Sequence, residues 1–446
     1  MNRSIGFPYG TAALLVLALA LASGVWLAAH PVRSATADLT MWTFANTHYN
    51  AYKAAVPSFE KAHPGVHVDV QLVSGTAVTS RLQAAFWADL DVPDMVEVEI
   101  SSAAAFFRGP LEHVGFLDLT DRIHRAGLWD GMVQARFAPY TSRGRIFGLP
   151  HDVHPVQLAY RRDIVERLGV DVDKIETWDD FVAVGRRITV PNKRYMLEMP
   201  DTEASRLEMC LFQRGGGYFD KEGRCRFDDE VGVQTMLWYV PLVAGPRRIG
   251  GDLGGGQILT KAIEDGYLLF LAAPDWRTMS FEMDVPRVSG KMALMPLPAV
   301  KRGGPRTSTW GGTMLAITRR SPHPELAWEF AKHLYLNPAE LAERFRGTNI
   351  IPALRSAWRQ PAFSEPRPYW SNQRLGDSYA LLAPQTPYQY ASPFVSTAKG
   401  KLSEALVACV QRYRTRGPDG FEPFVRRQLR GSAGELRRLM SRSPFL

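Results

Sequence analysis

Cysteine is scarce in this chain, which has three cysteines among 446 residues and no C-x-x-C pair. The low number excludes a disulfide-dense scaffold, and the missing pair removes support for a zinc ribbon or a thioredoxin-like site. Two alternatives stay open for Cys210 and Cys225. They form a disulfide that closes the loop at Gly215-Gly216-Gly217, as an oxidising compartment allows, or they are unpaired thiols like Cys409.

The sequence also lacks the motifs of common catalytic classes. It has no G-x-S-x-G elbow, no H-E-x-x-H pair and no G-x-G-x-x-G after its first expected strand. A glycine-rich stretch at 250–256 is followed by Gln257 and Ile258, where a phosphate-binding loop has a lysine and a hydroxyl residue. His151 and His154 flank Asp152 in an H-x-x-H pattern, but without further placed ligands this pattern is a weak signal for a metal site. We therefore expect no catalytic residue, no metal and no cofactor.

Acidic residues are outnumbered by basic ones, which gives a formal net charge of +8, and much of the excess lies near the C-terminus. The arginines concerned are Arg412, Arg414, Arg416, Arg426, Arg427, Arg430, Arg437, Arg438 and Arg442. Attraction of phosphate or anionic lipid is one interpretation, and a solvated helix face is the one that we favour. No nucleic-acid-binding motif accompanies these arginines, so we expect no nucleic-acid partner.

Long apolar runs are missing apart from Thr11–Ala29, which follows the positive charge of Arg3. With the small residues Ala35-Thr36-Ala37 downstream, this pattern predicts an export signal, residues 1–37, that is cleaved before Asp38. The run is long for a signal, so an uncleaved membrane anchor is the alternative. No cysteine stands at the junction to carry a lipid.

Beyond this segment, strand and helix patterns alternate. The first unit is expected as a strand, a helix and a strand at 39–44, 46–63 and 66–72. A helix at 79–88 and a strand at 94–98 then place Glu99 and Ser101 just past a strand end. This position matters because α/β sheets hold ligands in crevices outside the carboxyl ends of their strands.

The alternation starts again after Gly148-Leu149-Pro150. We expect a strand at 156–160, and a helix that begins with a capping box at Thr177-Trp178-Asp179-Asp180. Further strands are expected at 290–297 and 314–317, and a helix opens at Pro324. Two hydrophobic cores of ordinary size would account for the chain length, so the sequence predicts an α/β protein with two lobes.

Several aromatic residues fall at expected strand ends and turns, and these are Trp42, Phe44, Trp276 and Trp310. A sugar ring has an apolar face that packs on an indole, and a rim of hydroxyls that needs polar partners. Glu99, Asp152 and Arg277 could supply that rim. Core packing is the alternative for each isolated aromatic side chain.

The order of short motifs resembles the family 1 extracellular solute-binding proteins of ABC importers, which bind maltose and oligosaccharides. The resemblance covers nearly the whole chain after residue 37, and its motifs are specific only in combination. They are Leu39-Thr40-Met41-Trp42, Phe59-Glu60-Lys61, Pro64-Gly65-Val66, Pro93-Asp94-Met95-Val96, Leu117-Asp118-Leu119-Thr120, Gly148-Leu149-Pro150, Tyr160-Arg161-Arg162-Asp163, Thr177-Trp178-Asp179-Asp180-Phe181, Gly215-Gly216-Gly217-Tyr218-Phe219-Asp220, Trp310-Gly311-Gly312 and Ala327-Trp328-Glu329-Phe330.

The resemblance implies a type II periplasmic-binding-protein fold, with two α/β lobes and a ligand cleft between them. The N-terminal lobe would comprise 38–150 and 299–350, and the C-terminal lobe 151–298 and 351–446. Closure would be a hinge motion near Leu149-Pro150 and Pro298. The positions that match the family's ligand site are Trp42, Phe44, Glu99, Ser101, His151, Asp152, Trp276, Trp310, Gly311 and Gly312.

The resemblance further implies a periplasmic, monomeric protein that captures a carbohydrate, in particular an oligosaccharide, and delivers it to permease subunits in the membrane. His151 departs from the aromatic residue that many members carry at this position, which leaves the ligand less defined. Two alternatives stay open. The ligand is another polar solute, such as a glycerophosphate ester or a polyamine, or the protein is an anchored sensor that reports its ligand to a receptor.

Overall fold

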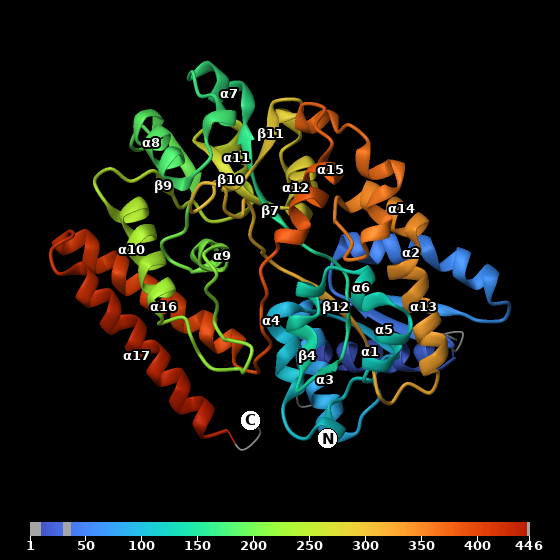
Figure 1. The fold of residues 1–446 in the computed structure, drawn as a ribbon. Helices are drawn as coiled ribbons and strands as arrows, with labels where there is room; N and C mark the ends of the chain where they lie inside the picture. The colour runs from blue at the N-terminus through green and yellow to red at the C-terminus, as the bar shows by residue number, and fades with distance from the viewer. Residues whose placement is uncertain (1–9, 30–36, 444–446) are drawn as a thin grey trace, which may run out of the picture.

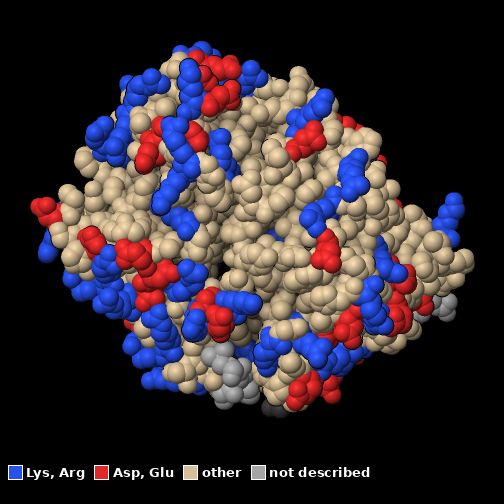
Figure 2. Space-filling view, in the orientation of Figure 1, with Lys and Arg blue, Asp and Glu red and all other residues tan. Residues whose placement is uncertain are grey.

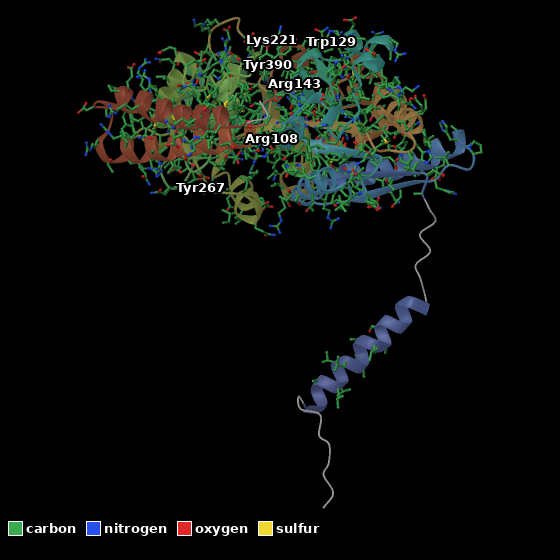
Figure 3. All side chains as sticks on the ribbon, turned by 90° about the horizontal axis from the view of Figure 1, so that it is seen from below. Arg108, Trp129, Arg143, Lys221, Tyr267 and Tyr390 are labelled. Carbon is green, nitrogen blue, oxygen red and sulfur yellow. The ribbon has the colours of Figure 1, made fainter. Side chains whose placement is uncertain are left out.

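The computed structural model describes residues 10–29 and 37–443 (Figure 1). Helix α1 (Gly10–Ala29) stands apart from the rest of the protein (Figure 3), and its residues Leu15 and Leu21 are exposed. Within the described ranges, no helix combines the length and the apolarity needed to cross a membrane. The predicted cleavage motif falls largely on residues 30–36, which lie outside the described residues.

The first of two five-stranded sheets has the strand order β2-β1-β3-β12-β6. Its strands are β1 (Leu39–Thr43), β2 (Val68–Leu72), β3 (Met95–Glu99), β6 (Leu149–Pro150) and β12 (Thr313–Ile317). Strand β1 pairs in parallel with β2 and β3, whereas β12 returns antiparallel between β3 and β6. The expected strands at 39–44, 66–72, 94–98 and 314–317 are therefore confirmed. We name this sheet and the helices packed on it the first lobe.

The second sheet has the order β11-β7-β10-β8-β9, and we name it and its helices the second lobe. Its strands are β7 (Val156–Arg161), β8 (Tyr195–Glu198), β9 (Gly250–Gly251), β10 (Leu268–Pro274) and β11 (Met292–Pro296). Strand β7 pairs antiparallel with β10 and β11, and β8 lies parallel to β10 and β9. Every residue of β7 and β10 is buried, because helices cover both faces of this sheet.

Alternate side chains of each strand enter different cores. In β3, Met95 packs below α2 (Asn46–Ala62), and Val96 and Val98 pack on the opposite face below α3 (Gly75–Ala88). The expected capping box is present at the start of α8 (Trp178–Ile188), where the Thr177 and Asp180 side chains cap each other's backbone N–H groups.

The remaining helices fill the lobes and their connections. They are α4 (Ile100–Ala103), α5 (Thr120–Arg125), α6 (Leu128–Gly131), α7 (Arg162–Arg167), α9 (Ser205–Gln213), α10 (Glu230–Ala244), α11 (Gly256–Glu264), α12 (Asp275–Asp284), α13 (Pro324–Leu336), α14 (Pro338–Thr348), α15 (Leu375–Leu382), α16 (Val395–Arg416) and α17 (Phe421–Ser441). A short hairpin is formed by β4 (Thr141–Ser142) and β5 (Arg145–Ile146).

The arginine-rich C-terminal segment forms the paired helices α16 and α17, which pack against α10 in the second lobe (Figure 1). Several of its arginines bind nearby carboxylates: Arg414 binds Asp201, Arg426 binds Glu230, and Arg437 binds Asp228. Charges of both signs are mixed over the face of the molecule in Figure 2. These ion pairs support the interpretation of the segment as a solvated helix face.

All three cysteines are buried and unpaired in the structure. Cys210 lies on α9 and Cys409 on α16, both in the core of the second lobe, and Cys225 pairs through its backbone with Phe219. Burial raises the pKa of Cys210 to about 12 and that of Cys225 to about 11. The structure therefore supports the alternative of three buried, unpaired thiols.

Candidate functional site

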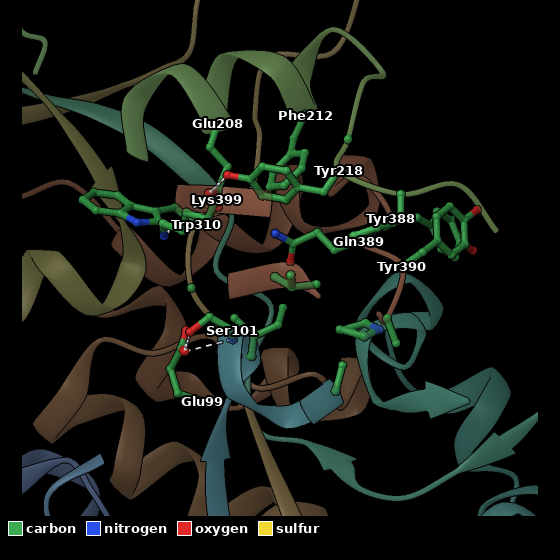
Figure 4. Close-up of a pocket in the computed structure, with 18 residues that line it drawn as sticks. Glu99, Ser101, Glu208, Phe212, Tyr218, Trp310, Tyr388, Gln389, Tyr390 and Lys399 are labelled. Atoms are coloured by element: carbon green, nitrogen blue, oxygen red, sulfur yellow. Dashed lines mark hydrogen bonds and ion pairs between the residues drawn. The ribbon is translucent and has the colours of Figure 1, made fainter. Parts of the chain in front are cut away.

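A pocket lies between the two lobes, with residues of both lobes and of the connecting segments in its walls (Figure 4). Its empty volume is about 710 Å³, including the solvent at its mouth. The first lobe contributes the end of β3 and the start of α4, and the second lobe contributes α9, the loop after it and the start of α16. The pocket thus lies at the carboxyl end of β3, where the sequence predicted a ligand crevice.

Glu99 and Ser101 form part of the wall from the first lobe. The Glu99 carboxylate accepts the backbone N–H of Ser101 at 2.9 Å, as well as the Ser101 hydroxyl, and so caps α4. Burial raises the pKa of Glu99, and these hydrogen bonds oppose the shift. The sequence correctly placed both residues at a strand end, and the structure adds that they hold each other in position.

Glu208 on α9 provides the main polar group on the opposite wall. Its carboxylate accepts the Tyr218 hydroxyl at 2.6 Å and lies 3.6 Å from the ammonium group of Lys399. The Glu208 charge raises the pKa of Lys399. The Tyr218 ring also meets Phe212 edge to face, with centroids 5.9 Å apart. This wall therefore offers aromatic surface beside an ion pair in which the charges of Glu208 and Lys399 compensate each other.

Trp310 lines the pocket from the segment that links the two sheets. The guanidinium of Arg206 lies over its ring, 3.9 Å from the centroid, and Trp276 meets it edge to face at 5.5 Å. The Trp276 indole N–H donates to the Trp310 carbonyl at 3.2 Å. Trp276 thus supports Trp310 from behind and is absent from the pocket lining.

A second pair of aromatic residues, Tyr388 and Tyr390, lies on the segment between α15 and α16. Their rings are nearly parallel, with an angle of 17° and centroids 6.0 Å apart. Gln389 between them also lines the pocket, and its side-chain oxygen accepts from Arg136 at 3.4 Å. Figure 4 shows the two tyrosines on the side away from Trp310.

Beneath the pocket, a buried polar network joins the lobes. Arg136, which is 1% exposed, donates to Asp152, to the Thr309 hydroxyl and to the Gly311 carbonyl, each at 3.1 Å. His154 then connects Asp152 to Asp275 of the second lobe. Asp152 is held ionised, because its cationic neighbours overcome the effect of burial and keep its pKa well below the usual value.

The structure brings four of the predicted site residues into the pocket wall, and these are Glu99, Ser101, Trp310 and Gly311. His151 and Asp152 are fully buried below it, at the connection between β6 and β7. Trp42 donates its indole N–H to Gln71 at 3.1 Å. Phe44 lines a separate hollow beside α3. Neither Trp42 nor Phe44 is among the residues that line the pocket.

Arg277 does not line the pocket, although its guanidinium lies 5.5 Å from the ring centroid of Trp310, and it binds Glu198 through two hydrogen bonds of 2.7 and 2.9 Å. Arg206 binds the same carboxylate at 2.9 Å. Burial alone would raise the pKa of Glu198, but the two guanidinium groups lower it to about 2. In this structure, the guanidinium of Arg277 is therefore engaged by a protein carboxylate.

Gly312 has little room around its Cα atom. A Cβ there would lie 2.1 Å from a guanidinium nitrogen of Arg136, and its φ of 152° also favours glycine. At Gly311, where φ is 90°, a Cβ would come within 3.3 Å of Trp276 and His154. The small residues at these two positions thus let the polar network and Trp276 approach the backbone.

Sequence reasoning missed several residues of the pocket wall, including Glu208, Phe212, Gln389 and Lys399. Two signals were available in the sequence. The motif at 215–220 carries Tyr218 and Phe219, and Tyr388 and Tyr390 form a Y-x-Y pair between prolines. Glu208 and Lys399 gave no such signal, because they lie on ordinary helices that only tertiary packing brings together.

Comparisons with known proteins agree on the family and the fold. Residues 45–340 match the family model described as bacterial extracellular solute-binding protein. An arabinooligosaccharide-binding protein of Halalkalibacterium halodurans is 27% identical over 341 residues, 75% of each chain. A protein of Bacillus subtilis with the same name is 28% identical over 302 residues, 67% of this chain and 69% of the relative.

A solved structure described as an extracellular solute-binding protein of family 1 has a TM-score of 0.73 to this chain at 21% identity. It covers 89% of this chain, which in turn covers 99% of it. The expected fold, that of the type II periplasmic binding proteins, is confirmed.

Proposed function

Because the chain belongs to the family of bacterial extracellular solute-binding proteins, we propose that it captures an oligosaccharide between its lobes and delivers it to an ABC importer in the membrane. The observation that carries this proposal is the composition of the pocket wall. Six aromatic residues line it, namely Phe212, Tyr218, Phe219, Trp310, Tyr388 and Tyr390. They provide the flat apolar surfaces on which sugar rings pack.

Polar groups stand between these aromatic side chains. Glu99, Glu208 and Gln389 offer oxygens that accept hydrogen bonds from hydroxyls, and the Gln389 amide and Lys399 offer donors. Both relatives are named for binding arabinooligosaccharides, which supports a neutral polyhydroxylated ligand for this protein. An oligosaccharide therefore fits the pocket in both apolar and hydrogen-bonding character.

The pocket wall favours a sugar over the two other solutes considered. A phosphate ester calls for arginine, the side chain suited to bidentate phosphate binding, and no arginine is found among the described residues that line the pocket. A binding site for a polyamine needs carboxylates that are not already paired with a cation. Here Glu208 is matched by Lys399, and burial shifts Glu99 towards its neutral form.

We further propose that ligand binding closes the two lobes by a hinge motion about the connecting segments. In this proposal the N-terminal lobe comprises 38–150 and 299–350, and the C-terminal lobe comprises 151–298 and 351–446. The position of β12 in the first sheet supports the return of the chain to the N-terminal lobe after residue 298. The closed monomer would present both lobes to the permease, without carrying out a chemical reaction.

Export to the periplasm completes the proposed function, with residues 1–37 removed as a signal. Mass spectrometry of the exported protein tests this step, because an N-terminus at Asp38 is expected after cleavage. An intact N-terminus would support the anchored sensor instead.

Ligand class can be tested by titration calorimetry and thermal shift. The protein is screened against arabino-, malto- and galacto-oligosaccharides, glycerophosphate esters and polyamines. We expect one sugar class to raise the unfolding midpoint, since a ligand that binds only the folded state stabilises it. A response to a phosphate ester or an amine, with none to any sugar, would refute the carbohydrate assignment.

The site can be tested with matched tryptophan variants. Trp310→Ala removes an aromatic wall and should weaken sugar binding by roughly tenfold or more, equivalent to about 1.4 kcal/mol. Trp87→Ala is the control, because Trp87 is 87% exposed and lines a different hollow on the first lobe. Equal affinities of the two variants would place the ligand elsewhere.

A further inference from the structure

Three ligand-capable side chains meet in the core of the first lobe, away from the pocket wall. They are His48 on α2, Glu97 on β3 and His151 just after β6, with exposures of 5%, 0% and 1%. One nitrogen or carboxylate oxygen from each lies within 4.8 Å of the other two. Three segments far apart in the sequence therefore bring an N, N, O donor set to one buried point.

Glu97 has an unusual position for a carboxylate. It points from β3 towards the apolar layer below α2, on the same side as Met95. Its oxygens accept from the Thr43 hydroxyl at 2.5 Å, the Tyr335 hydroxyl at 2.6 Å and the Tyr52 hydroxyl. A buried carboxylate needs such partners, and they fix its orientation towards His48, whose Nδ1 lies 3.0 Å away.

His151 provides an independent observation that points to a ligand at this position. Its Nδ1 lies 3.0 Å from Asp152 Oδ2, and an ionised carboxylate only accepts hydrogen bonds, so Nδ1 carries the hydrogen. In the neutral ring, Nε2 then has a free lone pair. Nε2 is buried and has no hydrogen-bond partner among the described residues. A carboxylate that orients a histidine through its N–H is the usual support of a metal-bound imidazole.

We propose that His48, Glu97 and His151 bind a divalent first-row transition metal, with zinc as the best-matched ion. Two imidazoles and one carboxylate are ligands that zinc accepts in sites of three protein ligands. When the ion is bound, His48 carries its single hydrogen on Nε2, so that the Nδ1 lone pair faces the metal, and the three donors contract around the ion to about 2.0–2.2 Å. The ion joins α2, β3 and the segment that enters the hinge, so it stabilises the first lobe.

The experiment supplies metal during refolding, because all three side chains are buried. The full chain is unfolded with a chelator, then refolded with Co²⁺ or Zn²⁺ and desalted. We expect one equivalent of metal by elemental analysis, visible d–d absorption bands for the Co²⁺ protein, and a higher unfolding midpoint than that of the metal-free protein.

His48→Gln and His151→Gln should each lose the stoichiometric metal and the visible bands. His67→Gln is the control, because the His67 side chain is 66% exposed, and it should keep both. Folding of each variant is checked by circular dichroism, and the visible bands report the ligands directly. A wild-type protein that retains no stoichiometric metal after refolding in its presence, or a His48→Gln variant with unchanged bands, would overturn the proposal.

Discussion

His154 should give this protein a stability that falls as the solution becomes alkaline. Its Nδ1 lies 2.5 Å from Asp275 and its Nε2 lies 3.0 Å from Asp152. Ionised carboxylates only accept hydrogen bonds, so both ring nitrogens must carry hydrogens and the imidazole is charged. Burial would lower the pKa of His154, but the two carboxylates raise it to about 9.

The size of the effect follows from the difference between this pKa and the ordinary value of 6.5. It corresponds to on the order of 3 kcal/mol of stability. Because the pKa is raised in the folded state, this contribution is fully present below about pH 6.5. It is lost as the pH rises towards and through 9, since the unfolded chain then binds fewer protons than the folded one.

The substitution His154→Asn tests this expectation. Asparagine does not titrate, and it tolerates the positive φ of 53° at this position. Urea unfolding of both proteins between about pH 6 and pH 9 gives the difference in unfolding free energy. We expect that difference to shrink by about 3 kcal/mol across the range. A constant difference would show that His154 is not the charged bridge between the two carboxylates.

Three further predictions concern single features. Arg136→Met should lower the unfolding free energy by about 3–5 kcal/mol in denaturant titration, since it leaves Asp152 with fewer partners in the core; a loss below 1 kcal/mol would contradict this. Gly312→Ala should lower the thermal midpoint, because its Cβ would clash with Arg136, whereas Gly347→Ala, which has open space, should not. A thiol reagent should find no reactive cysteine in the native protein and three after unfolding without reductant; one reactive thiol would reveal a disulfide.

Much of the fold could be predicted from the sequence because local patterns specify it. The period-two alternation at 66–72 is strand β2, and the Thr177 capping box begins α8. The site was less predictable, because its residues become neighbours only through tertiary packing. Glu99 was found from its place at a strand end, whereas Lys399 faces Glu208 only because α16 returns beside α9.

The tryptophans show the same limit of prediction from sequence. Trp276 and Trp310 looked alike in the sequence, since both were expected at strand ends or turns, yet Trp310 lines the pocket and Trp276 supports it. Arg277 was expected to meet a ligand, but its guanidinium binds Glu198, which lies 79 residues away in the chain. Sequence spacing could identify residue types that suit a sugar. It could not show which of these residues already bind other groups of the protein.

Arg136 offers a physical link between the pocket and the segments of the proposed hinge. From the first lobe, it bonds to Asp152 between β6 and β7, to Gly311 between β11 and β12, and to Gln389 between α15 and α16. Gly311 and Gln389 also line the pocket. A ligand that contacts either residue therefore changes the surroundings of a group that holds the connecting segments. In the proposed hinge motion, pocket occupancy and the connecting segments would share these hydrogen bonds, so ligand binding would favour one lobe arrangement over another.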